Sequence, residues 1–135
     1  MLQFGDGAAA ALVTGDATGF AMHLSGEVPG RIATALTDPA FRDIVSDGAP
    51  PQTIDGWAVH AGGRSILDAV EHALHLPPDA LDASRQTLSE NGNMSSATLM
   101  FVLERLLAGP PVTRGVALAF GPGLAAEGFG FHSAP

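Results

Sequence analysis

His60 is the side chain in this sequence best suited to acid–base or oxyanion chemistry. It ends the apolar stretch 54–60, which predicts a buried strand, and Gly62 and Gly63 follow it. In α/β sheets ligands usually bind at strand ends, and glycines let a ligand approach the backbone closely. A buried histidine satisfied by local hydrogen bonds explains the same pattern, and the spacing alone does not separate the two interpretations.

Asn93 lies in the turn Asn91-Gly92-Asn93, just before an apolar helix. An amide side chain at the mouth of a buried helix can donate a hydrogen bond to a developing oxyanion. The simpler alternative is a turn followed by a helix N-cap at Ser95 or Ser96, and the residues by themselves favour it.

The segment Phe120-Gly121-Pro122-Gly123 predicts a rigid turn between two strands, because proline fixes φ and glycine removes side-chain bulk. Such a turn could form the wall of a pocket. It could equally be a simple hairpin connection.

Asp68, His72 and His75 share one face of a predicted helix and could in principle ligate a metal ion. Nothing else in the sequence supports a metal site. Histidines in the last turn of a helix also interact favourably with its dipole, so a plain surface position is the favoured interpretation.

A layered α/β domain must position these residues, because the predicted strands and helices alternate along the chain. Residues 97–103 are apolar nearly all round, so the helix that contains them should be buried on most sides. The predicted strands are 8–13, 19–24, 54–60, 112–120 and 124–131, with a turn at 14–18. One predicted helix begins near Pro29 and is broken or restarted by Pro39. The other predicted helices are 64–75, 80–90 and one from Ser95 or Ser96 to 107.

Composition restricts the classes of function. The 135 residues are 46% apolar and 15% charged, which fits one folded domain and excludes a disordered chain. No membrane span and no signal peptide are evident. The net charge of −8 argues against nucleic-acid binding. Because there is no cysteine, these residues cannot form a disulfide, a thiolate metal site or a cysteine nucleophile.

Taken together, the motifs resemble those of the type III polyketide synthases, the chalcone and stilbene synthase group. The related fatty-acid condensing enzymes of the ketoacyl synthase III type are the second choice, because they usually lack the proline of FGPG and the Met-Ser-Ser after the asparagine. The matching stretches are FGDGAAAALV from Phe4, EVPG from Glu27, WAVHAGGRSILDAVE from Trp57, LSENGNMSSATLMFVLERL from Leu88 and AFGPGLAAEG from Ala119.

The resemblance implies a thiolase-like αβαβα layered α/β half-domain, partly truncated, with residues 1–135 as one C-terminal domain. It implies decarboxylative condensation of a CoA-linked starter with malonyl-CoA, with CoA thioesters as substrates and no resident cofactor or metal. The family's catalytic histidine and asparagine fall on His60 and Asn93. His60 Nε2–H and the Asn93 amide would donate to a thioester oxygen, and His60 would pair with the cysteine thiolate.

The resemblance also suggests residues that contact substrate. Phe4 falls on a gatekeeper phenylalanine, and Met22 falls where many plant members have a second one. Ser65 lies where the family's backbone approaches the CoA arm. Ser95 and the Gly121-Pro122-Gly123 loop would line the cyclisation cavity.

Two departures from the family qualify the expected activity. The cysteine-bearing N-terminal half has no counterpart in the sequence, and only fifteen residues separate Asp6 from Met22, where the family has several tens more. The chain would then act with a cysteine-bearing half from another chain or a longer reading frame, or with a homodimer partner, in the cytoplasm. Alternatives are a non-catalytic remnant or interaction module, and a residual malonyl-CoA decarboxylase. An apolar face should be exposed, first of all on the helix around Phe101.

Overall fold

The computed structural model describes residues 12–16, 19–23, 26–121 and 125–133. Phe4, Pro122 and Gly123 lie outside the described residues. In chain order the elements are β1 (Leu12–Asp16), β2 (Gly19–His23), α1 (Val28–Thr37), α2 (Pro39–Val45), a short 3-10 turn (Pro51–Thr53), β3 (Gly56–Val59), α3 (Arg64–Leu74), α4 (Asp82–Asn91), α5 (Ala97–Leu107), β4 (Gly115–Phe120) and β5 (Ala126–Phe131).

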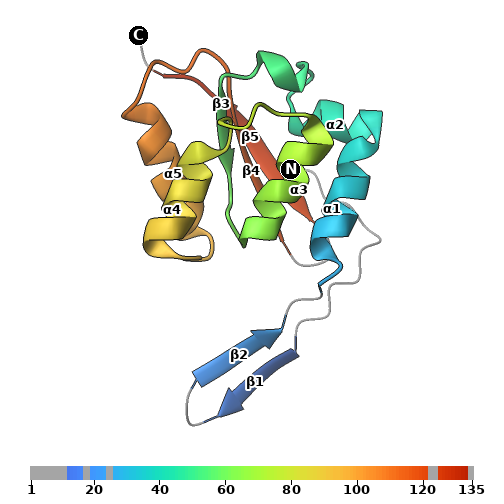
Figure 1. Ribbon diagram of the computed structural model, residues 1–135, viewed down its shortest axis with the longest axis vertical. Coiled ribbons are helices and arrows are strands. Elements are labelled where there is room, and N and C mark those ends of the chain that lie inside the picture. The colour runs from blue at the N-terminus through green and yellow to red at the C-terminus, as the bar shows by residue number, and fades with distance from the viewer. Residues whose placement is uncertain (1–11, 17–18, 24–25, 122–124, 134–135) are drawn as a thin grey trace.

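The central sheet has the strand order β3-β4-β5. Strands β3 and β4 are parallel, with Gly56 opposite Gly115, whereas β4 and β5 are antiparallel. Helices α1, α2 and α3 lie on one side of this sheet and α4 and α5 on the other (Figure 1). The prediction of a layered α/β domain is therefore confirmed.

Side-chain alternation along the strands divides the core between the two faces of the sheet. Trp57 and Val59 of β3 pack with the apolar residues of α1, α2 and α3. Ala58 and Ala117 instead pack against Val102 and its neighbours on α5. All four residues of β3 are buried, as expected for a strand covered on both faces.

Local sequence signals explain where the first helices begin and end. The carboxylate of Asp38 accepts hydrogen bonds from the backbone N–H groups of Ala40 and Phe41, which caps α2. Pro39 occupies the first turn of α2, where its missing N–H costs nothing. The prediction that Pro39 ends one helix and starts another is thus confirmed.

Three features differ from the predictions. β1 extends to Asp16, so residues 14–16 form a strand rather than part of the predicted turn. Strands β1 and β2 form a separate two-stranded sheet, and this hairpin points away from the α/β body (Figure 1). Met100 and Phe101 of α5 are exposed, so the burial on most sides expected for this helix is wrong, while the exposed apolar face expected around Phe101 is confirmed. Ser96 occupies the N-cap position of α5 without a side-chain hydrogen bond. Within the described ranges, no helix is long and apolar enough to cross a bilayer.

Candidate functional site

His60 is the first residue after β3, at the carboxyl edge of the parallel pair. Its backbone N–H donates to the carbonyl of Leu118 at 2.8 Å, which continues the ladder with β4 by one residue. Its side chain is only partly buried. Gly121 follows β4 at the same edge, since the carboxyl ends of parallel strands lie side by side.

The loop between α4 and α5 brings Asn93 to this edge. The Asn93 Nδ2 group donates to the carbonyl oxygen of Gly62 at 3.1 Å. The Oδ1 atom of the same side chain accepts from the backbone N–H of Ser95 at 2.8 Å. The His60 Nε2 atom lies 2.8 Å from the carbonyl oxygen of Ser95. The structure therefore joins His60, Asn93 and Ser95 in one hydrogen-bond network.

This network defines the protonation pattern of the His60 ring. A backbone carbonyl can only accept, so the hydrogen lies on Nε2, and in the neutral ring Nδ1 has a free lone pair. A side chain at Gly62 would have its Cβ 3.7 Å from Nδ1, so the glycine leaves this side of the ring uncovered. The resemblance implies that the Nε2 proton meets a thioester oxygen, but in the structure it is directed to the Ser95 carbonyl.

Thr98 anchors the loop to the first turn of α5. Its backbone N–H donates to the Ser95 carbonyl at 3.0 Å, and its hydroxyl accepts from the backbone N–H of Met94 at 2.8 Å. Thr98 is fully buried. Thr98 therefore ties the loop to the start of α5, but its hydroxyl accepts from an N–H that precedes the helix and does not replace the N-cap expected at Ser95 or Ser96.

The other residues suggested by the resemblance are less closely connected to this network. Ser65 is exposed on the first turn of α3, which begins directly after Gly63. Met22 lies on β2 opposite Val13, in the hairpin that points away from the α/β body (Figure 1). The described part of the Gly121-Pro122-Gly123 loop is Gly121, whose N–H donates to the Ala125 carbonyl at 2.7 Å.

Ion pairs between helices support the site, and the sequence reasoning did not find them. Arg85 of α4 bonds to Asp68 at 2.7 Å and to Glu71 at 2.8 Å, both on α3. The hydrogen bond to Glu71 raises the pKa of the Arg85 guanidinium above its ordinary value, more than partial burial lowers it. Arg105 of α5 pairs with Glu90 of α4. Ion pairs therefore link α3, α4 and α5, the helices next to the two loop segments of the network.

His72 of α3 and His75, the residue after the helix, do not form a metal centre with Asp68. Asp68 bonds to Arg85, and the His72 and His75 rings are tilted, with centroids 6.5 Å apart. No group of three or more potential ligands gathers in the described parts of the chain. A surface role for the two histidines is consistent with this arrangement.

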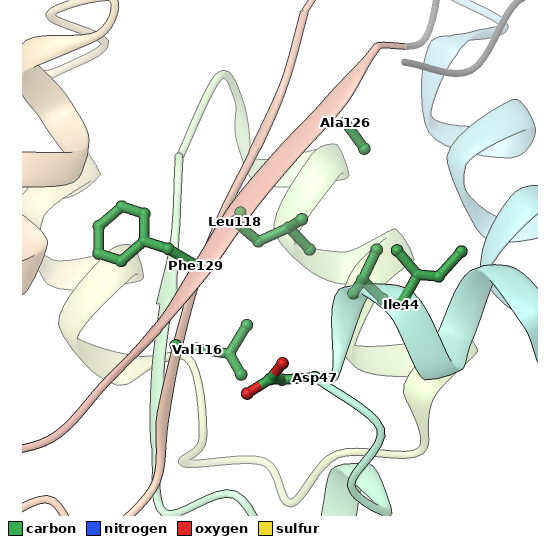
Figure 2. Close-up of a pocket in the computed structure, with 9 residues that line it drawn as sticks. Ile44, Asp47, Val116, Leu118, Ala126 and Phe129 are labelled. Atoms are coloured by element: carbon green, nitrogen blue, oxygen red, sulfur yellow. The ribbon is translucent and has the colours of Figure 1, made fainter. Parts of the chain in front are cut away.

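A cavity of about 60 Å³ lies elsewhere, between α2 and β5 (Figure 2). Ile44, Val116 and Leu118 lie together on one side of β5, whereas the ring of Phe129 points to the other side (Figure 2). Asp47 contributes a carboxylate to its lining. Neither His60 nor Asn93 lines this cavity, so it is separate from the hydrogen-bond network described above.

Comparisons with known proteins identify the family of this chain. Residues 5–135 match the family of chalcone and stilbene synthases, C-terminal domain. PKS-I from the brown alga Ectocarpus siliculosus is 28% identical, with a TM-score of 0.79 over 93% of this chain and 36% of that chain. The C-terminal type III polyketide synthase domain of Steely1 from Dictyostelium is 30% identical, with a TM-score of 0.81 over 99% and 39%.

A bacterial relative gives the same result. The 1,3,6,8-tetrahydroxynaphthalene synthase of Streptomyces coelicolor A3(2) is 33% identical, with a TM-score of 0.77 over 93% of this chain and 37% of that chain. The chain thus spans between 36% and 39% of the length of these solved chains. The layered, thiolase-like α/β architecture agrees with theirs. The chain therefore belongs to the chalcone and stilbene synthase family, and it corresponds to the C-terminal domain of that family.

Proposed function

We propose that this chain contributes the histidine and the asparagine of a type III polyketide synthase site, which condenses a CoA-linked starter with malonyl-CoA. The observation that carries the proposal is the network that joins His60 and Asn93, from separate segments, at the carboxyl edge of β3. The 135 residues contain no cysteine. The nucleophilic thiol therefore comes from a polypeptide segment other than these residues.

His60 is the base that we propose for that thiol. Its Nε2–H is held by the Ser95 carbonyl, so Nδ1 is the atom that accepts the thiol proton. The thiolate then attacks the starter thioester, the carbonyl carbon–sulfur bond to CoA breaks, and the CoA thiolate leaves. The imidazolium formed has both ring N–H groups, one bonded to Ser95 and the other paired with the anionic centre.

Asn93 has a donor suited to the decarboxylation step. Loss of CO2 from malonyl-CoA leaves its bonding electrons as an enolate, whose oxygen is negatively charged. One Nδ2 hydrogen bonds to Gly62, and the second is available for this oxygen. The enolate carbon then attacks the acyl thioester, a carbon–carbon bond forms, and the cysteine thiolate is released.

The partners of this chemistry are an acyl-CoA, malonyl-CoA and a cysteine-bearing synthase segment, in a family-like homodimer in the cytoplasm. The support for these partners is the family and the small share of the solved chains that this chain covers. Proline and glycine at 121–123 match the family's cavity-lining loop.

The test is to co-express this chain with the cysteine-bearing part of the Streptomyces coelicolor synthase and to follow incorporation of radiolabelled malonyl-CoA. We expect product from the wild type, and a loss of about a hundredfold or more in His60→Ala and Asn93→Ala. His72→Ala, an exposed histidine of α3, is the matched control and should keep full activity.

The outcomes separate the alternatives. No product with any cysteine-bearing segment would overturn the proposal and favour a non-catalytic module. Release of CO2 from malonyl-CoA by this chain alone would instead indicate a decarboxylase that needs His60 and Asn93 but no thiol.

A further inference from the structure

Ser95 contacts both groups of the proposed site through its backbone. Its carbonyl oxygen is 2.8 Å from His60 Nε2, and its N–H donates to Asn93 Oδ1 at 2.8 Å. Its φ of +58° places it in the left-handed region, which residues other than glycine seldom adopt. We infer that Ser95 is a positioning residue, which orients His60 and Asn93 through this left-handed backbone and not through its hydroxyl.

The left-handed conformation is what lets one residue serve both side chains. It directs the N–H of Ser95 back to Asn93 while its carbonyl faces His60 across the loop. The same carbonyl accepts from the Thr98 N–H at 3.0 Å, so it is fixed to the first turn of α5. The orientation of the carbonyl is therefore set by a helix and does not depend on the histidine.

The consequence for His60 is a single tautomer. The Ser95 carbonyl selects the form with hydrogen on Nε2 and leaves Nδ1 as the acceptor. The consequence for Asn93 is a single orientation of its amide, because only Oδ1 can accept from the Ser95 N–H. The catalytic meaning of this inference rests on the proposed function, whereas the tautomer and the amide orientation are properties of the chain itself.

Three substitutions at Ser95 separate the backbone from the hydroxyl. Ser95→Gly favours the left-handed region, Ser95→Ala removes only the hydroxyl, and Ser95→Val disfavours the region because its side chain is β-branched. Ser96→Val is the matched control, since Ser96 has a right-handed φ of −56° and an exposed side chain.

The readout is the long-range ¹H–¹⁵N NMR spectrum of the His60 ring in the full chain, which reports the tautomer without any substrate. We expect the Nε2–H tautomer in the wild type and in Ser95→Gly, Ser95→Ala and Ser96→Val. We expect its loss to a mixture of tautomers in Ser95→Val.

An Nδ1–H tautomer in the wild type would overturn the inference, even if Ser95→Val failed to fold. So would a Ser95→Val spectrum identical to that of the wild type, or a change of tautomer in Ser95→Ala. An Nε2–H tautomer in a chain that yields no product with any cysteine-bearing segment would support the inference and contradict only the proposed function.

Discussion

The two glycines after His60 have different surroundings although they are adjacent in the sequence. A Cβ on Gly62 would lie 3.7 Å from both Nδ1 and Cε1 of His60, whereas a Cβ on Gly63 would meet nothing within 4 Å. Gly63 has an extended backbone that any residue adopts, with φ of 179°. Gly62 therefore leaves the Nδ1 side of the ring open, and Gly63 has no such role.

Gly62→Ala should reduce condensation in the co-expressed enzyme by about tenfold while the free energy of unfolding changes little. The added methyl group makes an ordinary contact with the ring, so the fold tolerates it, but it partly covers Nδ1. The measurement is the rate of malonyl-CoA incorporation together with urea unfolding. Gly63→Ala is the control and should match the wild type in both; equal rates in the two variants would contradict this role for Gly62.

Strand β3 is a short edge strand, and α4 completes its hydrogen bonding. The backbone N–H of Val59 donates to the Ser84 hydroxyl at 3.1 Å, and both residues are fully buried. This bond closes an edge position that β4 cannot reach. His60 follows Val59 directly, so the contact also fixes where the strand ends.

Ser84→Ala should lower the free energy of unfolding by about 1–3 kcal/mol, because it leaves the Val59 N–H buried without an acceptor. Ser89→Ala on the exposed side of α4 is the control and should change it by less than about 0.5 kcal/mol. Urea unfolding followed by tryptophan fluorescence measures both. If Ser84→Ala were as stable as Ser89→Ala, the edge bond would contribute nothing.

Asp55 ties the start of β3 to the segment before β4. Its two carboxylate oxygens accept from the backbone N–H groups of Thr113 and Arg114 at 2.9 and 2.8 Å. Slight burial raises the pKa of Asp55, but the bonds from Arg114 and Thr113 outweigh it, so the pKa lies below its ordinary value of 3.8. Ionised Asp55 thus stabilises the fold, and this contribution is lost as the pH falls through the folded-state pKa.

Asp55→Asn should destabilise the fold by about 1 kcal/mol at pH 7, because an amide offers one acceptor where the carboxylate offers two. The difference from the wild type should shrink as the pH falls below 3.8, the ordinary pKa of the carboxyl. Urea unfolding at steps between pH 7 and pH 3 measures it. Asp43→Asn, an exposed acid of α2, controls for loss of charge; a pH-independent difference for Asp55→Asn would refute the assignment.

The elements whose signals are local were predictable from the sequence. Helix α3 was expected at 64–75 and is found at Arg64–Leu74, because one apolar face, a preceding glycine pair and a following proline pair all agree. The proximity of His60 and Asn93 followed from the resemblance alone, since the residues by themselves favoured a turn and an N-cap.

Features that depend on contacts between distant segments could not be read from the sequence. The left-handed backbone of Ser95 is bonded to His60, far away along the chain. The pairing of Arg85 with Glu71 depends on how α3 and α4 pack. The exposed face of α5 around Phe101 was expected from the resemblance to one half of a larger fold, whereas hydrophobic periodicity alone suggested burial on most sides.

At the scale of the whole molecule, the outer face of α5 is the largest departure from a self-contained domain. Met100 and Phe101 are 64% and 43% exposed, and Leu107 is 51% exposed, while Val102 and Leu103 face the sheet. Clustered apolar side chains on one helix face favour association with another surface. The chains of the solved relatives are more than twice as long as the part that matches this chain.

Replacing Met100 and Phe101 together by glutamine should abolish self-association of this chain. Each Å² of apolar surface buried on association contributes about 25 cal/mol of favourable free energy. Replacing the two largest exposed apolar side chains of α5 therefore removes much of the driving force for association. We expect the sedimentation coefficient of the wild type to rise with concentration and that of the double variant to stay constant. The free energies of unfolding of the wild type and the double variant should agree within about 0.5 kcal/mol. Glu104→Gln, an exposed substitution on the same helix, should sediment like the wild type. If the double variant associates as strongly as the wild type, the surface that drives association lies elsewhere. If the wild type stays monomeric at every concentration, the exposed face of α5 does not drive association.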